Sequence, residues 1–209
     1  MKTVTFGCRL NIYESEIIKN TLKKANINDV VVFNSCAVTQ EAERQVLQAI
    51  RKEKKSNPNA KIVVTGCAAQ ISPEKFSNMP EVHKVVGNID KFEAENYISE
   101  DRVLVTDIMK IKETANHMVT DFENNTRAFL EIQNGCNHRC TFCIIPFGRG
   151  NNRSVSVGSI IEQVKKIVDQ GFKEVIFTGV DITDYGVNLP AQPKLGQLVK
   201  RFLLRCCRN

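Results

Sequence analysis

The chain has 209 residues, a hydrophobic share of 42% and a formal net charge of +6. These values predict a folded protein of one large or two small domains, and the modest basic excess is compatible with a polyanionic partner such as RNA. Residues 1–16 contain no apolar stretch of signal-peptide length, and no apolar run is long enough to span a bilayer. We therefore expect a cytoplasmic protein, in which the eight cysteines indicate metal binding or catalysis in preference to disulfides.

Strand and helix patterns alternate over the first hundred residues. Apolar runs at 3–6, 29–33 and 61–65 predict strands, and helical spacing of apolar residues predicts helices at 11–25, at 39–55 and from 72 onward. Weaker patterns predict a strand, a helix and an extended segment between 82 and 108. This alternation predicts an α/β fold with a flavodoxin-like parallel sheet covered on both faces. We assign residues 1–100 to this first domain and 101–126 to a polar linker.

Three cysteines follow the first three predicted strands. Cys8, Cys36 and Cys67 each stand a few residues beyond the last apolar strand position. The carboxyl ends of parallel strands meet at one edge of a sheet, so these thiols can converge, and Gly7 and Gly66 permit close backbone approach. Two interpretations stay open. Each cysteine can be a small buried hydrophobic residue, or the three can hold a metal cluster together.

A second cysteine group opens the C-terminal half. A predicted strand at 127–133 is followed by Cys136, Cys140 and Cys143, spaced C-x3-C-x2-C, then by a predicted helix at 155–170 and a strand at 173–178. This order predicts the opening of a βα-repeat barrel with the cysteines at its catalytic end. Three thiolates on one loop can hold three irons of a cubane cluster and leave the fourth open to a small molecule. His138 leaves a zinc site as the alternative.

At this point the chain resembles a known family. The C-x3-C-x2-C loop after a first barrel strand is similar to that of radical S-adenosylmethionine enzymes. A preceding domain with three separated cysteines resembles the methylthiotransferases of that superfamily. Residues 6–16, 34–39, 65–70 and 178–182 are similar to the branch that acts on threonylcarbamoyladenosine in tRNA.

The resemblance implies two [4Fe–4S] clusters and S-adenosylmethionine as cofactors. Cys136, Cys140 and Cys143 would hold the cluster that cleaves S-adenosylmethionine to a 5′-deoxyadenosyl radical. In the family this radical removes hydrogen from C2 of the modified adenosine beside the anticodon. Sulfur arrives from the second cluster, here on Cys8, Cys36 and Cys67, and a second S-adenosylmethionine supplies the methyl group. The expected partners are tRNA and an electron-donor protein, with no membrane and no DNA.

Six further residues are weaker candidates. Phe142 could pack on the adenine of S-adenosylmethionine or belong to the core. Thr178, Gly179 and Asp181 are candidates for contacts with this cofactor, with helix capping as the alternative for Asp181. Arg149 and Arg153 could meet RNA phosphate or form a solvated basic loop.

The chain departs from the family at its C-terminal end. The family continues through further βα units into a small β-rich RNA-binding domain, which we expect to be absent here, so residues 127–209 would be a truncated radical S-adenosylmethionine domain. Two hypotheses follow. One is an active tRNA methylthiotransferase, completed by another polypeptide. The other is an inactive fragment that keeps iron–sulfur binding or acts as an interaction module.

Overall fold

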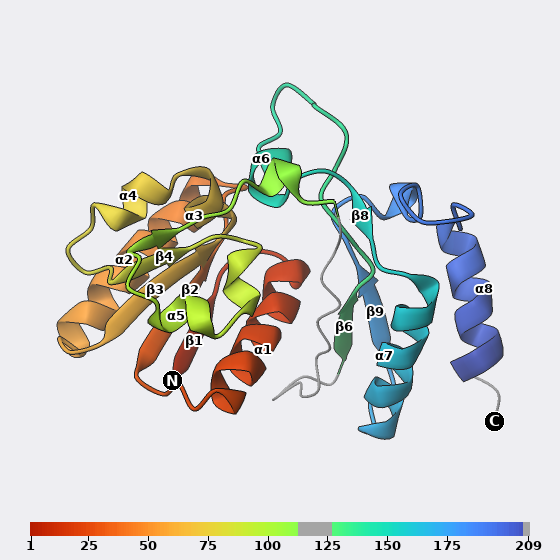
Figure 1. Ribbon diagram of the computed structural model, residues 1–209, viewed down its shortest axis with the longest axis horizontal. Coiled ribbons are helices and arrows are strands. Elements are labelled where there is room, and N and C mark those ends of the chain that lie inside the picture. The colour runs from red at the N-terminus through yellow and green to blue at the C-terminus, as the bar shows by residue number, and fades with distance from the viewer. Residues whose placement is uncertain (113–126, 207–209) are drawn as a thin grey trace.

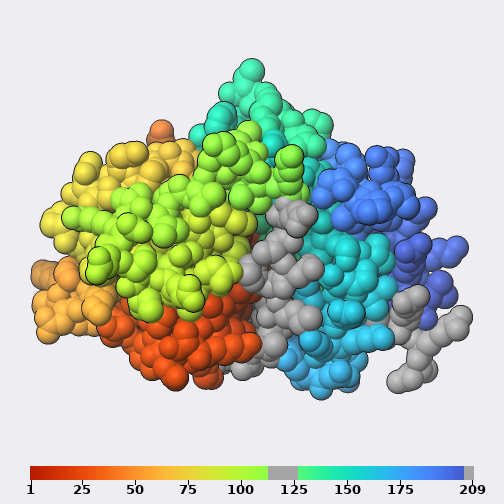
Figure 2. Space-filling model, viewed as in Figure 1, coloured from red at the N-terminus to blue at the C-terminus, as the bar shows by residue number. Residues whose placement is uncertain are grey.

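A computed structural model of the chain describes residues 1–112 and 127–206, apart from the side chains of residues 205 and 206. These residues form two α/β units that lie side by side (Figure 1). In the space-filling view, the part of the second unit near α6 projects above both units (Figure 2). Part of the expected linker, residues 113–126, lies outside the described residues.

The first unit is built on a five-stranded parallel sheet, which confirms the expected α/β class. Its strands pair in the order of the chain: β1 (Lys2–Thr5), β2 (Val30–Ser35), β3 (Lys61–Gly66), β4 (Lys84–Val86) and β5 (Val103–Leu104). The flavodoxin order 2-1-3-4-5 places the first strand inside the sheet, whereas β1 here lies at the edge. The domain boundary expected at residue 100 falls before β5, so the first unit extends past it.

Helices cover both faces of this sheet. The helical segments of the unit are α1 (Arg9–Lys24), α2 (Gln40–Ser56), α3 (Cys67–Ile71), α4 (Pro73–Ser77), η1 (Asp90–Phe92), α5 (Glu95–Ile98) and η2 (Ile108–Lys110). On one face, Ile18 and Leu22 of α1 pack with Val32. On the other, Val46 and Ile50 of α2 pack with neighbouring strand residues. The two cores arise because successive strand side chains point to opposite faces.

The second unit contains a two-stranded parallel sheet. Its elements are β6 (Ala128–Glu131), β7 (Gln133–Asn134), α6 (Ile145–Arg149), β8 (Arg153–Ser154), α7 (Val157–Asp169), β9 (Val175–Thr178), η3 (Ile182–Asp184) and α8 (Leu195–Cys206). β6 and β9 pair in parallel on either side of α7, as a βα repeat requires. The strand expected at 127–133 is divided, because β7 leaves β6 and pairs antiparallel with β8.

Helix α1 joins the two units. Ile18 and Leu22 face the first sheet, whereas Tyr13 and Ile17 belong to the buried core of the second unit together with Ala128. α1 therefore lies between the two sheets (Figure 1), and Cys8, which follows β1, is its N-cap residue. Among the described residues, no helix combines the length and apolar character needed to cross a membrane.

Candidate functional site

The three cysteines of the first unit converge at the carboxyl edge of its sheet. Cys8, Cys36 and Cys67 all line one cavity of about 160 Å³. Cys36 and Cys67 are buried and Cys8 is exposed. We call these three residues the first triad. Their convergence supports the shared-site interpretation over three unrelated core cysteines.

Glycines allow this convergence. Gly7 has a φ of 99°, and a Cβ atom placed on it would lie 2.7 Å from the Cys36 Sγ atom. Gly66 has a φ of 96°, and its Cβ would lie 2.3 Å from the backbone oxygen of Ser35. A larger residue at either position would meet both a left-handed backbone and a steric clash. These two glycines thus bring the loops after β1 and β3 against the end of β2.

Cys136, Cys140 and Cys143, here called the second triad, lie on the loop between β7 and α6. The loop is held by backbone hydrogen bonds from the Cys136 amide to Gly150 and from the Cys143 amide to Cys140. The Arg139 guanidinium also donates a hydrogen bond to the Cys136 carbonyl at 2.8 Å. Cys140 is exposed and the other two are half-buried, so all three thiols lie at the surface of the second unit.

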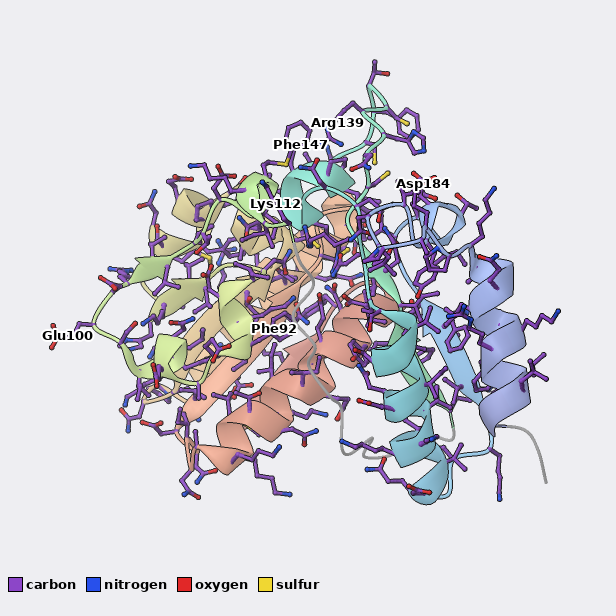
Figure 3. The ribbon with its side chains drawn as sticks, turned by 45° about the vertical axis from the view of Figure 1, so that its right-hand side comes forward. Phe92, Glu100, Lys112, Arg139, Phe147 and Asp184 are labelled. Atoms are coloured by element: carbon purple, nitrogen blue, oxygen red, sulfur yellow. The ribbon has the colours of Figure 1, made fainter. Side chains whose placement is uncertain are left out.

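The two triads share one side of the molecule. The cavity of the first triad is also lined by Ile144 and Ile145, just after the second triad, and by Gly179 and Val180, just after β9. Figure 3 places Arg139 and Phe147 together at the top of the view, with Asp184 nearby on the second unit. The sequence placed each triad on its own, and the packing of the units makes them neighbours.

The loop after β9 approaches the second triad. The Cys136 thiol lies 3.7 Å from the Asp181 carboxylate, and the His138 Nε2 atom lies 3.3 Å from the same oxygen. Thr178 is buried at the end of β9, and Gly179 lines the shared cavity. The Asp181 carboxylate caps no helix through a side-chain hydrogen bond, although it accepts one from Thr183. Its place beside Cys136 disfavours the helix-capping alternative.

Sequence reasoning missed Gln133, which organises this loop. Its side-chain oxygen accepts hydrogen bonds from the backbone amides of Val180 and Asp181, both at 2.8 Å. Its side-chain nitrogen donates to the carbonyl of Gly135, beside the first cysteine of the second triad. The signal available in the sequence was a polar residue at the end of a predicted buried strand.

Phe142 is 91% exposed. This exposure rules out the alternative in which the ring belongs to the core. A phenylalanine with this exposure between two candidate ligands is free to pack against a bound molecule.

Arg149 and Arg153 differ from the expected solvated or phosphate-binding loop. Both side chains are buried. Arg149 donates hydrogen bonds to the Glu14 carboxylate at 2.7 and 3.0 Å, and Arg153 donates to the Arg149 carbonyl at 2.9 Å. Neither guanidinium is available to RNA in this structure, because the packing of α1 against the second unit covers them.

Glu14 lies at the centre of a buried charge network. Its carboxylate pairs with both Arg149 and Lys91 at 2.7 Å. Burial by itself would raise the pKa of Glu14, but the two cations outweigh burial and lower it to about 2. Nearby, burial and the charge of Glu14 raise the pKa of Glu131 to about 7, although Arg149 partly offsets them. Sequence reasoning missed this network, since a single acidic residue on α1 carries no mark of a distant partner.

Neither triad is drawn together as it would be around one zinc ion. Zinc–sulfur bonds of about 2.3 Å would hold tetrahedral thiolates within roughly 4 Å of each other. Among the residues that the structure describes, the side chains that bring three ligand atoms within 4.8 Å are His138, Asp181 and Asp184, without any cysteine. The wider spacing of the thiols is compatible with a multi-iron cluster.

Comparison with known proteins identifies both units. Residues 1–87 match the Uncharacterized protein family UPF0004, and residues 130–205 match the Radical SAM superfamily. A Rickettsia prowazekii protein named "Threonylcarbamoyladenosine tRNA methylthiotransferase MtaB" is 55% identical over 96% of this chain and 48% of its own length. Over both units the chain is similar to the radical S-adenosylmethionine methylthiotransferases. This confirms the family that the sequence motifs resembled.

More distant relatives in the family carry two different names. A Bacillus subtilis protein with the same name as the Rickettsia relative is 39% identical over 90% of this chain and 46% of its own length. A Clostridium botulinum "tRNA-2-methylthio-N(6)-dimethylallyladenosine synthase" is 33% identical over 94% of this chain and 48% of its own length. The chain spans about half the length of the curated relatives it matches.

The family implies a [4Fe–4S] cluster and S-adenosylmethionine. The chemistry of the second unit fits them, because three cysteines stand on one surface loop at the carboxyl end of the barrel strands. An exposed aromatic ring and a carboxylate lie beside these thiols. Both are suitable for contact with a nucleoside and its charged amino acid portion.

Proposed function

We propose that this chain methylthiolates the threonylcarbamoyl-modified adenosine next to the anticodon of tRNA. The observation that carries the proposal is the shared cavity, which brings the first triad up to the loop after β9 beside the second triad. In this reading Cys136, Cys140 and Cys143 hold one [4Fe–4S] cluster and Cys8, Cys36 and Cys67 hold another. When bound, these groups and S-adenosylmethionine supply radical cleavage, sulfur and the methyl group.

The protein's own residues place these groups. Gln133 connects the loop after β9 to the second triad, so that Asp181 lies beside Cys136. Thr178 and Gly179 precede Asp181 at the same strand end, and we assign all three to contacts with S-adenosylmethionine. Phe142 supplies an exposed ring for the adenine. The high identity to a relative named for threonylcarbamoyladenosine favours that substrate over dimethylallyladenosine, and tRNA and an electron-donor protein are the proposed partners.

The first test counts clusters. After anaerobic reconstitution with iron and sulfide, the chain should hold about eight irons, and Cys36→Ala and Cys140→Ala should each retain about four. Cys140→Ala should lose reductive cleavage of S-adenosylmethionine, whereas Cys36→Ala should keep it. Iron near zero with stoichiometric zinc would reject the proposal, and so would loss of both clusters in either variant.

The second test asks for product. The reconstituted chain is incubated with reductant, S-adenosylmethionine and tRNA that carries threonylcarbamoyladenosine, and the nucleosides are analysed by mass spectrometry. We expect the methylthio derivative from this tRNA and none from the Cys36→Ala variant. A chain that cleaves S-adenosylmethionine but never forms the derivative, even with a native electron donor, would contradict the proposed reaction and favour the inactive-fragment hypothesis.

A further inference from the structure

Arg149 is contributed by the second unit but extends to the cysteines of the first. Its side chain, which is 4% exposed, lines the same cavity as Cys8, Cys36 and Cys67. The backbone of the preceding residue, Gly148, also packs closely against the first triad. A Cβ atom on Gly148 would lie 3.1 Å from the Cys67 Cβ atom. The end of α6 therefore forms one wall of the first triad's site.

Hydrogen bonds connect this wall to the first triad. The Arg149 guanidinium donates to the Asn11 side-chain oxygen, which also lies 3.8 Å from the Cys8 thiol. Asn88 donates to the Gly148 carbonyl through the same nitrogen that lies 3.6 Å from the Cys67 Sγ atom. Each bridge joins a residue of the second unit to a different cysteine through one side-chain amide.

The charge of Arg149 acts on the whole first triad. Its guanidinium interacts electrostatically with the thiols of Cys8, Cys36 and Cys67. Lys91 is the other buried cation of the network, and its interactions include Cys67 of the triad. Arg153 is buried four residues away, yet its electrostatic partners are Glu131, Arg149 and Glu14, without a cysteine. Arg149 and Arg153 are thus both buried guanidinium groups, but of the two only Arg149 interacts electrostatically with the first triad.

We propose that Arg149 is a positioning residue of the second unit that raises the reduction potential of a cluster held by Cys8, Cys36 and Cys67. The inference rests on the proposed function, which assigns a cluster to this triad. One-electron reduction adds a negative charge to the cluster, and a nearby buried cation stabilises the reduced form. The first unit alone lacks this cation, so the packing of the second unit against the first supplies the charge that raises the potential.

A purely structural role for Arg149 makes a different prediction. If the guanidinium serves only to hold Glu14 across the interface, its loss lowers stability without moving the potential. The two roles separate when the cluster of the first triad is measured alone. The full chain with Cys136, Cys140 and Cys143 all replaced by alanine provides that background.

The experiment is a redox titration of this background, followed by the electron paramagnetic resonance signal of the reduced cluster. We expect Arg149→Gln to shift the midpoint potential to a more negative value, and Arg149→Lys, which keeps the charge, to shift it less. Arg153→Gln is the matched control and should leave the potential in place. Glu14→Gln removes the opposing charge and should shift it to a more positive value.

The outcomes separate this inference from the proposed function. If the background binds no iron while the chain with both triads binds about four, the first triad holds no cluster and the proposed function fails at that site. If the background binds a cluster whose potential is unmoved in both Arg149→Gln and Glu14→Gln, the positioning role is wrong. Glu14→Gln decides the matter if Arg149→Gln does not fold. An equal shift in Arg153→Gln would likewise overturn the assignment.

Discussion

The side-chain oxygen of Gln133 accepts a hydrogen bond of 2.8 Å from the backbone amide of Asp181, and so ties two loops of the second unit together. The same oxygen accepts from Val180, and the side-chain nitrogen donates to the carbonyls of Asn134 and Gly135. One buried amide therefore satisfies four backbone groups. Through it, the end of β9 is held against the start of the cysteine loop.

Gln133→Leu should weaken S-adenosylmethionine binding. The substitution leaves backbone groups without partners, at about 1–3 kcal/mol for each buried group, and frees the loop that carries Asp181. We expect roughly a tenfold rise in the dissociation constant, measured by equilibrium dialysis on the reconstituted chain. Gln163→Leu is the control, because Gln163 is also buried but accepts its hydrogen bond from Tyr13 on α1. Equal weakening in both variants would show a general loss of stability instead.

Glu131→Gln should flatten the dependence of stability on pH. Burial raises the pKa of Glu131 from 4.5 to about 7, so the folded chain binds this proton more tightly than the unfolded chain. The contribution is complete below the unfolded value and is lost as pH rises through the folded one. Since each pKa unit is worth about 1.4 kcal/mol, the ionised carboxylate costs about 3 kcal/mol under alkaline conditions.

Urea unfolding at about pH 5 and about pH 8 measures this difference. The wild type should lose stability between the two conditions, and Glu131→Gln should lose less, because its amide oxygen still accepts from Asn134. The titration of Glu14 does not contribute to the difference in stability between these two pH values, because its pKa of about 2 places its titration window below pH 4.5. Glu174→Gln, at an exposed carboxylate, should follow the wild type.

Lys91→Met should lower the free energy of unfolding. Lys91 and Glu14 are almost fully buried and lie 2.7 Å apart. Removing one partner of a buried pair costs about 3–5 kcal/mol. Lys61→Met breaks an exposed pair with Asp29 and should cost at most about 1 kcal/mol in the same urea experiment. Similar losses in the two variants would contradict the importance of burial.

Phe142→Ala should lower the affinity for S-adenosylmethionine and leave the free energy of unfolding almost unchanged. Because the ring is 91% exposed, its removal should change the free energy of unfolding by no more than about 0.5 kcal/mol. If the ring packs on adenine, the affinity for S-adenosylmethionine should fall by roughly 1 kcal/mol, or about fivefold. Phe142→Tyr should retain it. An unchanged affinity in Phe142→Ala would remove this residue from the cofactor site.

The two triads could be predicted because their signal is local. Cys136, Cys140 and Cys143 occupy one short loop, and Cys8, Cys36 and Cys67 each follow a strand whose apolar pattern is plain. Parallel pairing then places equivalent strand ends along one edge, which is a rule of topology that does not depend on individual contacts. The family and the α/β class followed from the same motifs.

Arg149, Arg153 and Glu14 could not be placed in the same way. An arginine in a loop rich in glycine and asparagine reads as solvated, and its burial depends on α1 lying between the two sheets. The partners Arg149 and Glu14 are 135 residues apart, so no periodicity or spacing connects them. Gln133 is similar, because its role depends on where β9 ends beside β7.

The sequence by itself determined which cysteines are candidates to hold iron and in which two units they stand, because strand ends and short loops are fixed by local patterns. Only the tertiary structure decided that residues next to the second triad line the cavity of the first triad and that a buried guanidinium forms part of its wall. The physical reason is that a buried charge is tolerated only with its partners in place. Those partners, Glu14 and Asn11, come from the other unit.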